Sequence, residues 1–310
     1  FYLLNLFGMK LINNLLIQII PFLPKSFIQL FASPYIAGIT DDEMLSTVKN
    51  LNTKGYDTAI DILGEHVKTE KEAREITEKY ANLYDEISSR SLQANLSIKL
   101  THIGQDLGYD IVKKNLMILT EKAKKHHNFL RLDMENSPYT SETITLYKEA
   151  LKIYPNVGIV LQAYMHRSMD DLNALANKHF NCRICKGIYI ESEDIAYADY
   201  EKIRENYIKL VQTGLQKGSY IGIAGHDEYL INHLYQWIQD NNIPKTQYEF
   251  QAMYGIPMEK TLEKLIQEGN KIRIYVPYGD NSYDYSMRRL KENPKMVGYI
   301  IKNLFKRIFG

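Results

Sequence analysis

Short runs of aliphatic and β-branched residues alternate with longer charged segments along most of the chain. Eight of these runs predict strands, at residues 56–63, 94–100, 128–134, 157–164, 182–190, 220–225, 248–253 and 271–276. Charged, helix-forming segments follow them, as at 70–88 and 195–216. Alternating strands and helices indicate a parallel sheet. Eight such units in ~250 residues favour a closed (β/α)8 barrel over an open doubly wound sheet, which is the alternative.

The repeating units place the barrel at residues 51–310 and leave residues 1–50 as an N-terminal helical segment that packs on it. No stretch rich in Pro, Gly or Ser divides the chain, so a single domain is expected. Residues 11–24 are uncharged but short, and two prolines interrupt them. A membrane span needs about 20 mainly apolar residues, so amphipathic helices are expected here instead. Because the sequence begins with Phe1, Met9 is a candidate start.

The end of the chain has the pattern of an amphipathic helix. Its apolar stripe consists of Val297, Ile300, Ile301, Leu304, Phe305 and Ile308, and its basic residues are Lys302, Lys306 and Arg307. Packing of the stripe against the barrel is the first interpretation. A basic amphipathic helix can also lie on a membrane surface, so a peripheral membrane contact is the alternative.

Composition excludes several classes of function. The formal charge of +1 gives no basic footprint for nucleic acid. Two cysteines are too few for a disulfide scaffold and fit a reducing compartment, so a cytoplasmic location is expected. Cys182 and Cys185 have the spacing of a redox or zinc pair, but strand alternation sends them to opposite faces. No metal site is therefore expected.

Polar or ionisable side chains stand at the C-terminal ends of all eight expected strands. They are Glu65, Lys99, Asp133, Gln162, Arg183, Lys186, His226, Gln251, Tyr275 and Tyr278. The active site of a (β/α)8 barrel lies at this end, and charged groups are seldom buried there without a partner. The pattern therefore predicts a functional site at the mouth of the barrel.

A second polar group follows the last strand. A helix over 282–291 would put Tyr285, Arg288, Arg289 and Glu292 on one face, where an apolar stripe is usual. Two guanidiniums together with Lys99 suit a small carboxylate or phosphate. The cations expected at the mouth also include Arg183 and Lys186, and they outnumber its acids (Asp133, Glu292 and Glu65), so a net cationic mouth is expected. Glu292 can brace Arg288. Four aromatic residues are expected to enclose a small apolar body: Tyr189, Tyr275, Tyr278 and Tyr285.

The residues of this mouth bear on two other kinds of chemistry. The segment 218–225, "GSYIGIAG", lacks the order of glycines that a Rossmann dinucleotide site requires. A lysine inside a barrel can form a Schiff base, so a lyase that uses Lys186 or Lys99 is an alternative. That chemistry has no use for the array of Gln162, Arg183 and His226.

Several motifs together resemble one family, in collinear order over roughly 35–294. They are "SIKLT" at 97–101, "LDMEN" at 132–136, "LQAY" at 161–164, "RICKGIYIE" at 183–191, "EFQAMYG" at 249–255, "RIYVPYG" at 273–279 and "YSMRRLKENP" at 285–294. The sequence resembles proline dehydrogenase, the FAD-dependent enzyme that oxidises L-proline to 1-pyrroline-5-carboxylate. It looks like the monofunctional bacterial type, because no aldehyde dehydrogenase half follows. The resemblance implies that electrons pass to a membrane quinone.

The resemblance also implies a role for each matching residue. Lys99, Arg288 and Arg289 would bind the proline carboxylate, with Tyr275 and Tyr285 beside the ring and Glu292, Tyr189 and Tyr278 in support. Asp133 and Arg183 would be the catalytic pair against the flavin, with Arg183 donating a hydrogen bond toward N5. The positions expected to hold FAD are Met134, Gln162, Arg183, Lys186, Gly187, Ile188, Gly225 and His226.

Two departures from the family pattern affect these expectations. The family usually has Thr where this chain has Gly225, which predicts weaker retention of FAD. The segment 280–284 lacks a Trp that is often seen in related bacterial enzymes, so the cover over the substrate is expected to differ. A catalytically inactive barrel that only binds proline is a further alternative, although Asp133, Arg183 and both arginines of the clamp are present.

Overall fold

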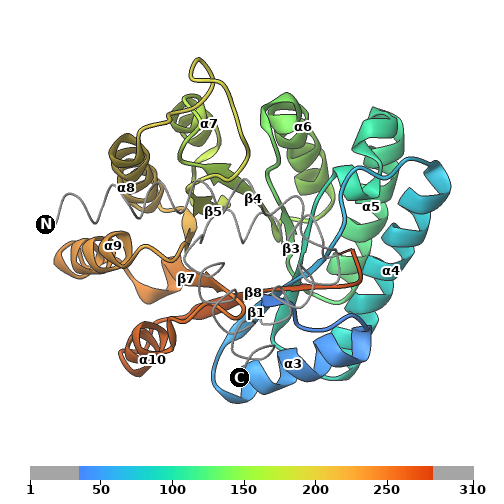
Figure 1. Cartoon of the computed structure of the whole chain (residues 1–310), viewed down its shortest axis with the longest axis horizontal. Helices are drawn as coiled ribbons and strands as arrows, with labels where there is room; N and C mark the ends of the chain where they lie inside the picture. Colours follow the sequence, from blue (N-terminus) through green and yellow to red (C-terminus); the bar gives the residue numbers. More distant parts are fainter. Residues whose placement is uncertain (1–34, 282–310) are drawn as a thin grey trace, which may run out of the picture.

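The computed structural model describes residues 35–281. Within this range the strands form one closed parallel barrel, in which neighbours follow chain order from β1 to β8. The barrel closes where β1 pairs with β8, with Thr58 opposite Ile274 and Ile62 opposite Tyr278. Closure confirms the predicted (β/α)8 fold and excludes the open doubly wound sheet. The helices form a ring outside the strands (Figure 1).

The strands and helices have the following bounds. The strands are β1 (Asp57–Ile62), β2 (Ala94–Ile98), β3 (Leu130–Leu132), β4 (Val157–Gln162), β5 (Asn181–Cys185), β6 (Tyr220–Ala224), β7 (Tyr248–Met253) and β8 (Ile272–Tyr278). The α-helices are α3 (Asp41–Thr53), α4 (Glu70–Ser89), α5 (Tyr109–Lys125), α6 (Ser137–Ile153), α7 (Ser168–Leu175), α8 (Tyr200–Gln216), α9 (Glu228–Asp240) and α10 (Glu259–Gln267). Short 3-10 helices are η3 (Thr101–Ile103), η4 (Gln105–Leu107) and η5 (Lys245–Gln247).

The fifth expected strand is shorter than the sequence pattern suggested. It was expected to reach residue 190, but β5 ends at Cys185. Two residues later Gly187 has φ +105°, a left-handed conformation that favours glycine and turns the chain out of the sheet. The helix expected over 195–216 begins only at Tyr200, where the side chain of Asp199 accepts a hydrogen bond from Lys202 N and caps the first turn.

Strand alternation separates an apolar layer from a polar barrel interior. On β8, Ile272, Ile274 and Val276 are buried in the hydrophobic core between strands and helices, whereas Arg273 and Tyr275 point inward and bond to side chains of other strands. Most barrels of this fold fill the interior with branched aliphatic residues. Here charged and amide side chains occupy it, which places polar chemistry on the barrel axis.

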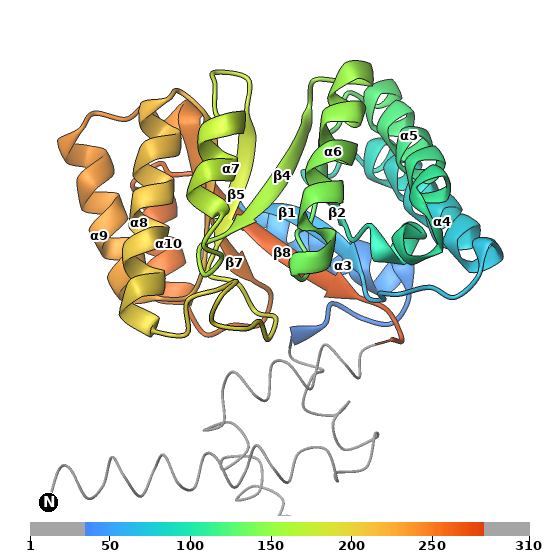
Figure 2. The same ribbon diagram turned by 90° about the horizontal axis from the view of Figure 1, so that it is seen from above.

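Helix α3 precedes the first strand and packs against the seam of the barrel. It buries Met44, Leu45 and Val48, and Thr40 and Glu43 form a capping box at its start. Upstream of it, Ala37 N donates to Pro277 O at 2.9 Å. Figure 2 shows α3 beside β1 and β8, on the side of the barrel away from α7 and α8.

Some expectations fall outside the described range of 35–281. These concern the N-terminal segment 11–24, the clamp residues Tyr285, Arg288, Arg289 and Glu292, and the stripe at 297–308. Among the helices between residues 35 and 281, none combines the length and apolar character needed to cross a membrane.

Candidate active site

Asp133 and Arg183 form a buried ion pair at the C-terminal end of the barrel. Asp133 directly follows β3, and its Oδ1 lies 2.6 Å from Arg183 Nη1 on β5. Ser97 Oγ on β2 donates to the same oxygen at 2.6 Å, and the Tyr275 hydroxyl on β8 donates to Oδ2 at 2.8 Å. Side chains from three strands therefore converge on one carboxylate, so the structure brings together the two residues expected to be catalytic.

The surroundings keep Asp133 ionised. Burial alone would raise the pKa of this carboxyl, but the charges of Arg183 and Lys99 and the hydrogen bonds from Ser97 and Tyr275 outweigh it and lower the pKa. Burial, followed by the nearby carboxylates, raises the pKa of Tyr275 far above its usual range. Tyr275 is thus a neutral donor, and the Arg183 guanidinium lies 5.1 Å from the centre of its ring.

Lys99 has a partner that sequence reasoning did not single out. Its Nζ lies 2.7 Å from Asp61 Oδ2 on the neighbouring strand β1. Burial lowers the pKa of Lys99, but the carboxylates of Asp61, Asp133 and Glu65 more than offset this and raise it. Asp57 and Asp61 are four residues apart on one strand, so alternation puts both on the same face. That spacing was the signal for a carboxylate inside the barrel.

The expectation of a net cationic mouth does not hold for the described part of the chain. Lys99 and Arg183 are matched there by Asp61 and Asp133. Glu65 and Glu135 add two more carboxylates, with an oxygen of each within 4.8 Å of the other. Any excess of positive charge therefore has to come from Arg288 and Arg289, which lie outside the described residues.

The residues expected to hold a cofactor form a second group on the β4 to β6 side of the barrel. Gln162 Nε2 donates to Met134 O at 3.2 Å, while its Oε1 is buried and has no hydrogen-bond partner among residues 35–281. A Cβ built on Gly225 would meet no atom within 4 Å. A buried acceptor without a partner and open space beside β6 fit a planar, hydrogen-bonding group such as a flavin.

Lys186 and His226 are anchored beside this group. Lys186 Nζ lies 3.1 Å from Asp227 Oδ2 and 2.9 Å from the Tyr200 hydroxyl. Arg204 also binds Asp227 through two nitrogens, which makes that carboxylate the hub of this cluster. His226 Nε2 accepts a hydrogen bond from Met253 N at 3.0 Å, which fixes the orientation of its ring.

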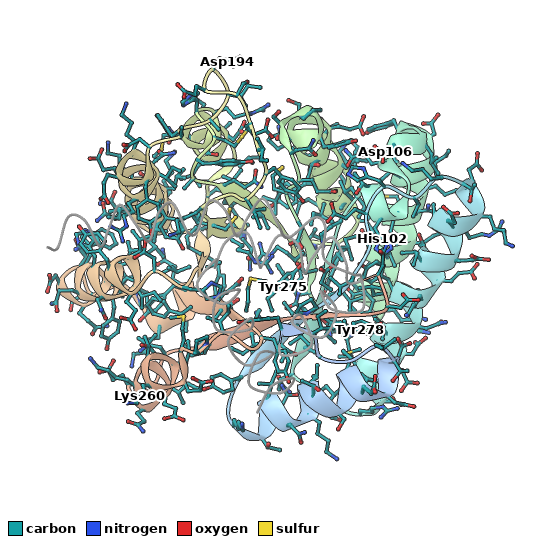
Figure 3. The ribbon with its side chains drawn as sticks, in the orientation of Figure 1. His102, Asp106, Asp194, Lys260, Tyr275 and Tyr278 are labelled. Atoms are coloured by element: carbon teal, nitrogen blue, oxygen red, sulfur yellow. The ribbon has the colours of Figure 1, made fainter. Side chains whose placement is uncertain are left out.

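Two of the supporting tyrosines lie in different places. Tyr189 is half-buried in the loop after β5, next to Ile188, which is 37% exposed. Tyr278 was expected to line the mouth, and this is wrong. It is completely buried, and Lys79 Nζ of α4 lies 5.1 Å from the centre of its ring. Burial, followed by the charge of Asp41 on α3, raises the pKa of its hydroxyl well above the usual range. Because Tyr278 is three residues from the inward Tyr275, it points to the helices (Figure 3).

The fold and the site define a (β/α)8 barrel with an Asp–Arg pair at its mouth, and the comparisons with known proteins place it in one family. The family model for proline dehydrogenase matches residues 44–300. The chain belongs to the proline dehydrogenase family.

Its relatives agree with this assignment. The chain is 33% identical over 279 residues to proline dehydrogenase 1 of Bacillus subtilis strain 168, covering 90% of this chain and 92% of that protein. It is 31% identical over 281 residues to the proline dehydrogenase of Deinococcus radiodurans, covering 89% and 90%. Proline utilization A (PutA) of Bdellovibrio bacteriovorus has a similar solved structure, with 26% identity and a TM-score of 0.79. That match covers 86% of this chain but only 33% of the PutA chain.

Proposed function

We propose that the protein oxidises L-proline to 1-pyrroline-5-carboxylate at the mouth of the barrel, with FAD as its cofactor. As a member of the family it is an oxidoreductase of the first step of proline catabolism. The observation that carries the proposal is the buried Asp133–Arg183 pair, held by Ser97 and Tyr275. Both residues stand where the family resemblance expects the groups that face the cofactor.

The proposed cofactor site uses the donors and the space beside β4, β5 and β6. FAD, when bound there, supplies the acceptor for the hydride that leaves the proline carbon beside the ring nitrogen. Gln162 offers a buried acceptor, Arg183 a charged donor, and Lys186 a cation that Asp227 holds in place. Met134, Gly187, Ile188, Gly225 and His226 complete the proposed contacts.

The proposed substrate site lies on the β1, β2 and β8 side. Lys99, kept charged by its neighbouring carboxylates, has an ammonium with three donors, of which Asp61 takes one. We assign the others, together with Arg288 and Arg289, to the proline carboxylate, with Tyr275 and Tyr285 against the ring. Proline must lose its ammonium proton before hydride transfer, and nearby positive charge favours that neutral form.

The proposed electron acceptor is a membrane quinone, reached through a peripheral membrane contact. The sequence pattern of 297–308 supports this, because a helix there would direct its three basic residues toward anionic headgroups and its apolar stripe into the surface. Each basic residue near such a surface adds about 1 kcal/mol, so binding should be weak and sensitive to salt. Truncation after Pro294 should abolish sedimentation with anionic vesicles and leave proline-driven flavin reduction intact. If the truncated protein still sediments with vesicles, the segment does not bind the membrane, and packing against the barrel becomes the favoured interpretation.

Anaerobic titration tests the catalytic assignment. Protein reconstituted with FAD should lose its yellow absorbance on addition of L-proline, and Arg183→Met should slow that loss about a hundredfold or more. Exposed Lys71 on α4, whose partner is the exposed Glu75, offers a matched control as Lys71→Met, which should behave like wild type. Proline binding with no bleaching would indicate a binding barrel, and a covalent adduct trapped by borohydride would indicate a lyase.

The structure gives the lyase alternative little support. A Schiff-base lysine needs a lowered pKa, whereas the pKa of Lys99 is raised, and Lys186 is tied to Asp227 and Tyr200.

Burial raises the pKa of Cys182 to about 12 and of Cys185 to about 11, so both remain thiols. Neither cysteine has the low pKa that redox chemistry requires.

A further inference from the structure

Arg183 is the first member of a chain of hydrogen bonds that runs down the barrel interior. Its Nε donates to Gln251 Oε1 at 2.6 Å, and Gln251 Nε2 donates to Glu249 Oε1 at 2.6 Å. Glu249 and Gln251 are two residues apart on β7, so both face the interior. All three side chains are at least nine-tenths buried. The chain connects the candidate catalytic arginine with groups well below the mouth.

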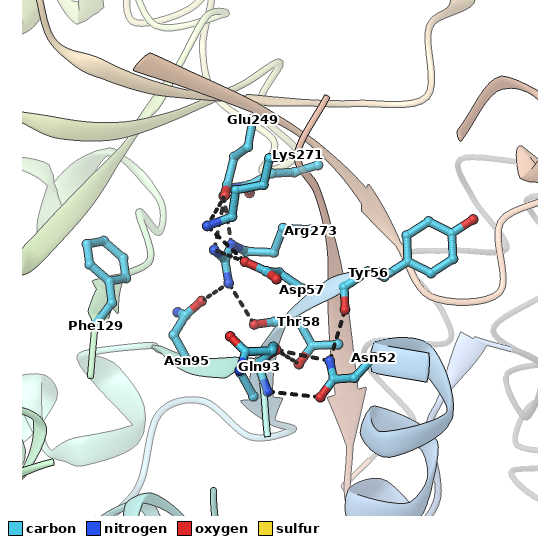
Figure 4. A network of polar contacts seen from close by, with 12 residues as sticks. Asn52, Tyr56, Asp57, Thr58, Gln93, Asn95, Phe129, Glu249, Lys271 and Arg273 are labelled. Carbon is cyan, nitrogen blue, oxygen red and sulfur yellow. Dashed lines mark hydrogen bonds and ion pairs between the residues drawn. The ribbon is translucent and has the colours of Figure 1, made fainter. Parts of the chain in front are cut away.

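Glu249 stays ionised because of the cations around it. Burial would raise the pKa of its carboxyl, but the charge and hydrogen bonds of Arg273, followed by Lys271 and Tyr220, lower it to about 2. Arg273 binds both carboxylate oxygens, with Nε 2.7 Å from Oε1 and Nη2 3.0 Å from Oε2. Arg273 is itself held by Asp57 and Asn95 (Figure 4). Glu249 is therefore a fixed carboxylate that only accepts hydrogen bonds.

This fixed carboxylate decides which way the Gln251 amide points. An amide can present either its oxygen or its NH2 to a neighbour, but only the NH2 can bond to Glu249. The oxygen must then face Arg183, which is a donor only, so both neighbours demand the same orientation. Gly222 on β6 leaves the room that this amide needs, because a Cβ there would lie 2.4 Å from Gln251 Nε2.

Two anchored nitrogens fix the plane of the Arg183 guanidinium. Gln251 holds Nε and Asp133 holds Nη1, both at 2.6 Å. Nη2 has no hydrogen-bond partner within residues 35–281, so its donors remain for a bound group. Because the guanidinium is planar and rigid, fixing two of its nitrogens also fixes the direction in which the third one donates.

We propose that Gln251 is a positioning residue for Arg183, and that Glu249 sets the direction of its amide. The pair keeps the free nitrogen of Arg183 aimed at the cofactor, so the barrel interior contributes to the orientation of a group at the mouth. The inference rests on the proposed function and adds a residue to it. We expect loss of the Gln251 amide to change the direction in which Arg183 Nη2 donates. We do not expect it to change the binding of proline or the stability of the barrel.

Gln251→Met tests the proposal, because methionine has nearly the length of glutamine but offers Arg183 Nε only a weak thioether acceptor and offers Glu249 no donor. With FAD bound, flavin reduction at saturating proline should slow about 10- to 100-fold, as expected for a misplaced catalytic group, with KM for proline little changed. The flavin should also form a weaker adduct with sulfite, a readout of nearby positive charge that requires no turnover. Gln251→Asn, which keeps the amide but is too short to bridge, should behave in the same way.

Tyr220→Phe is the matched control. It removes a hydrogen bond to Glu249 Oε2 at 2.9 Å and leaves the oxygen that Gln251 uses, so its reduction rate and sulfite affinity should match wild type. The inference is overturned if both Gln251 variants match wild type, if they lose FAD instead of slowing, or if Tyr220→Phe slows equally. Failure of the proposed function looks different, since wild type itself would then bind no FAD or would not be reduced by proline.

Discussion

Lys99 and Asp61 face each other across neighbouring strands, with Nζ 2.7 Å from Oδ2 and side chains only 11% and 2% exposed. The lysine expected to bind the substrate carboxylate is therefore already paired with a carboxylate of the protein. A buried ammonium without such a partner would tend to lose its proton. Asp61 keeps the cation charged and in place before any substrate arrives.

Removing that partner should destabilise the fold. Asp61→Asn removes the counter-charge that bonds directly to buried Lys99, and breaking a buried pair in this way costs about 3–5 kcal/mol. Denaturant unfolding at neutral pH measures the loss. Lys71→Ala, which removes an exposed pair with Glu75, should change stability by less than about 0.5 kcal/mol. Equal stability of Asp61→Asn and wild type would contradict this account of the pair.

The clamp can be tested although its arginines lie outside the described residues. Arg288→Met or Arg289→Met should each raise KM for proline about 30-fold while FAD stays bound, because a charge-assisted contact to a carboxylate is worth about 2 kcal/mol. Lys291→Met, in the same segment but off the expected stripe, serves as the control. The assignment fails if both arginine variants keep the wild-type KM in steady-state assays.

Adding the threonine that the family usually has should improve retention of FAD. Gly225→Thr introduces a hydroxyl where a Cβ meets nothing within 4 Å, and the backbone there needs no positive φ. One added hydrogen bond of about 1 kcal/mol should lower the Kd for FAD roughly fivefold. Fluorescence titration of the apoprotein measures this. A Kd that is unchanged or higher would remove Gly225 from the cofactor site.

Gly187→Ala is the contrasting substitution. Here a Cβ would lie 2.1 Å from a ring carbon of Tyr164, at a position with φ +105°. The variant should therefore bind FAD more weakly than wild type, because the loop after β5 has to move. If Gly187→Ala bound FAD as tightly as wild type, the loop after β5 would not belong to the cofactor site.

His102 predicts how stability depends on pH. Burial, followed by the charges of Lys99 and Lys79, lowers its pKa to about 3. The unfolded chain takes up a proton near pH 6.5 and the native protein does not, so stability falls as pH drops from about 6.5 toward 3. The slope is about 1.4 kcal/mol per pH unit for this one group. Urea unfolding of His102→Gln between pH 6 and 4 should show a slope shallower by that amount.

His179 provides the control for this measurement, because its side chain is exposed. His179→Gln should follow the wild-type pH dependence. A wild-type slope that His102→Gln leaves unchanged would show that the imidazole takes up its proton within the native protein.

The sequence predicted the barrel well because its signals are local. Aliphatic runs and charged segments alternate at a regular spacing, and Asp133 and Arg183 stand out as charges at strand ends. Partners were harder to predict, because they depend on which strands become neighbours. Asp61 for Lys99 and Asp227 for Lys186 became visible only once β1 lay beside β2 and the loops after β5 and β6 met.

Tyr278 shows a different limit. Its distance of three residues from Tyr275 already implied opposite faces, but its polar hydroxyl and its place near a strand end suggested the mouth. The free energy gained by burying the ring between the sheet and the helices outweighed the cost of burying its hydroxyl. Likewise, the isoleucines within 182–190 suggested a long strand, and a single left-handed glycine ended it early.

The pairing of β1 with β8 imposes an order on the synthesis and folding of the barrel. Thr58 pairs with Ile274, and Arg273 reaches Asp57 at 3.2 Å, across more than two hundred residues of intervening chain. Such distant pairing slows folding, and no ribosome-bound fragment that lacks β8 can close the ring. The segment that carries Arg288 and Arg289 is synthesised after β8. If these two arginines form the proposed clamp, a nascent chain acquires them only after the closing strand has been made, and a product terminated before residue 288 lacks both.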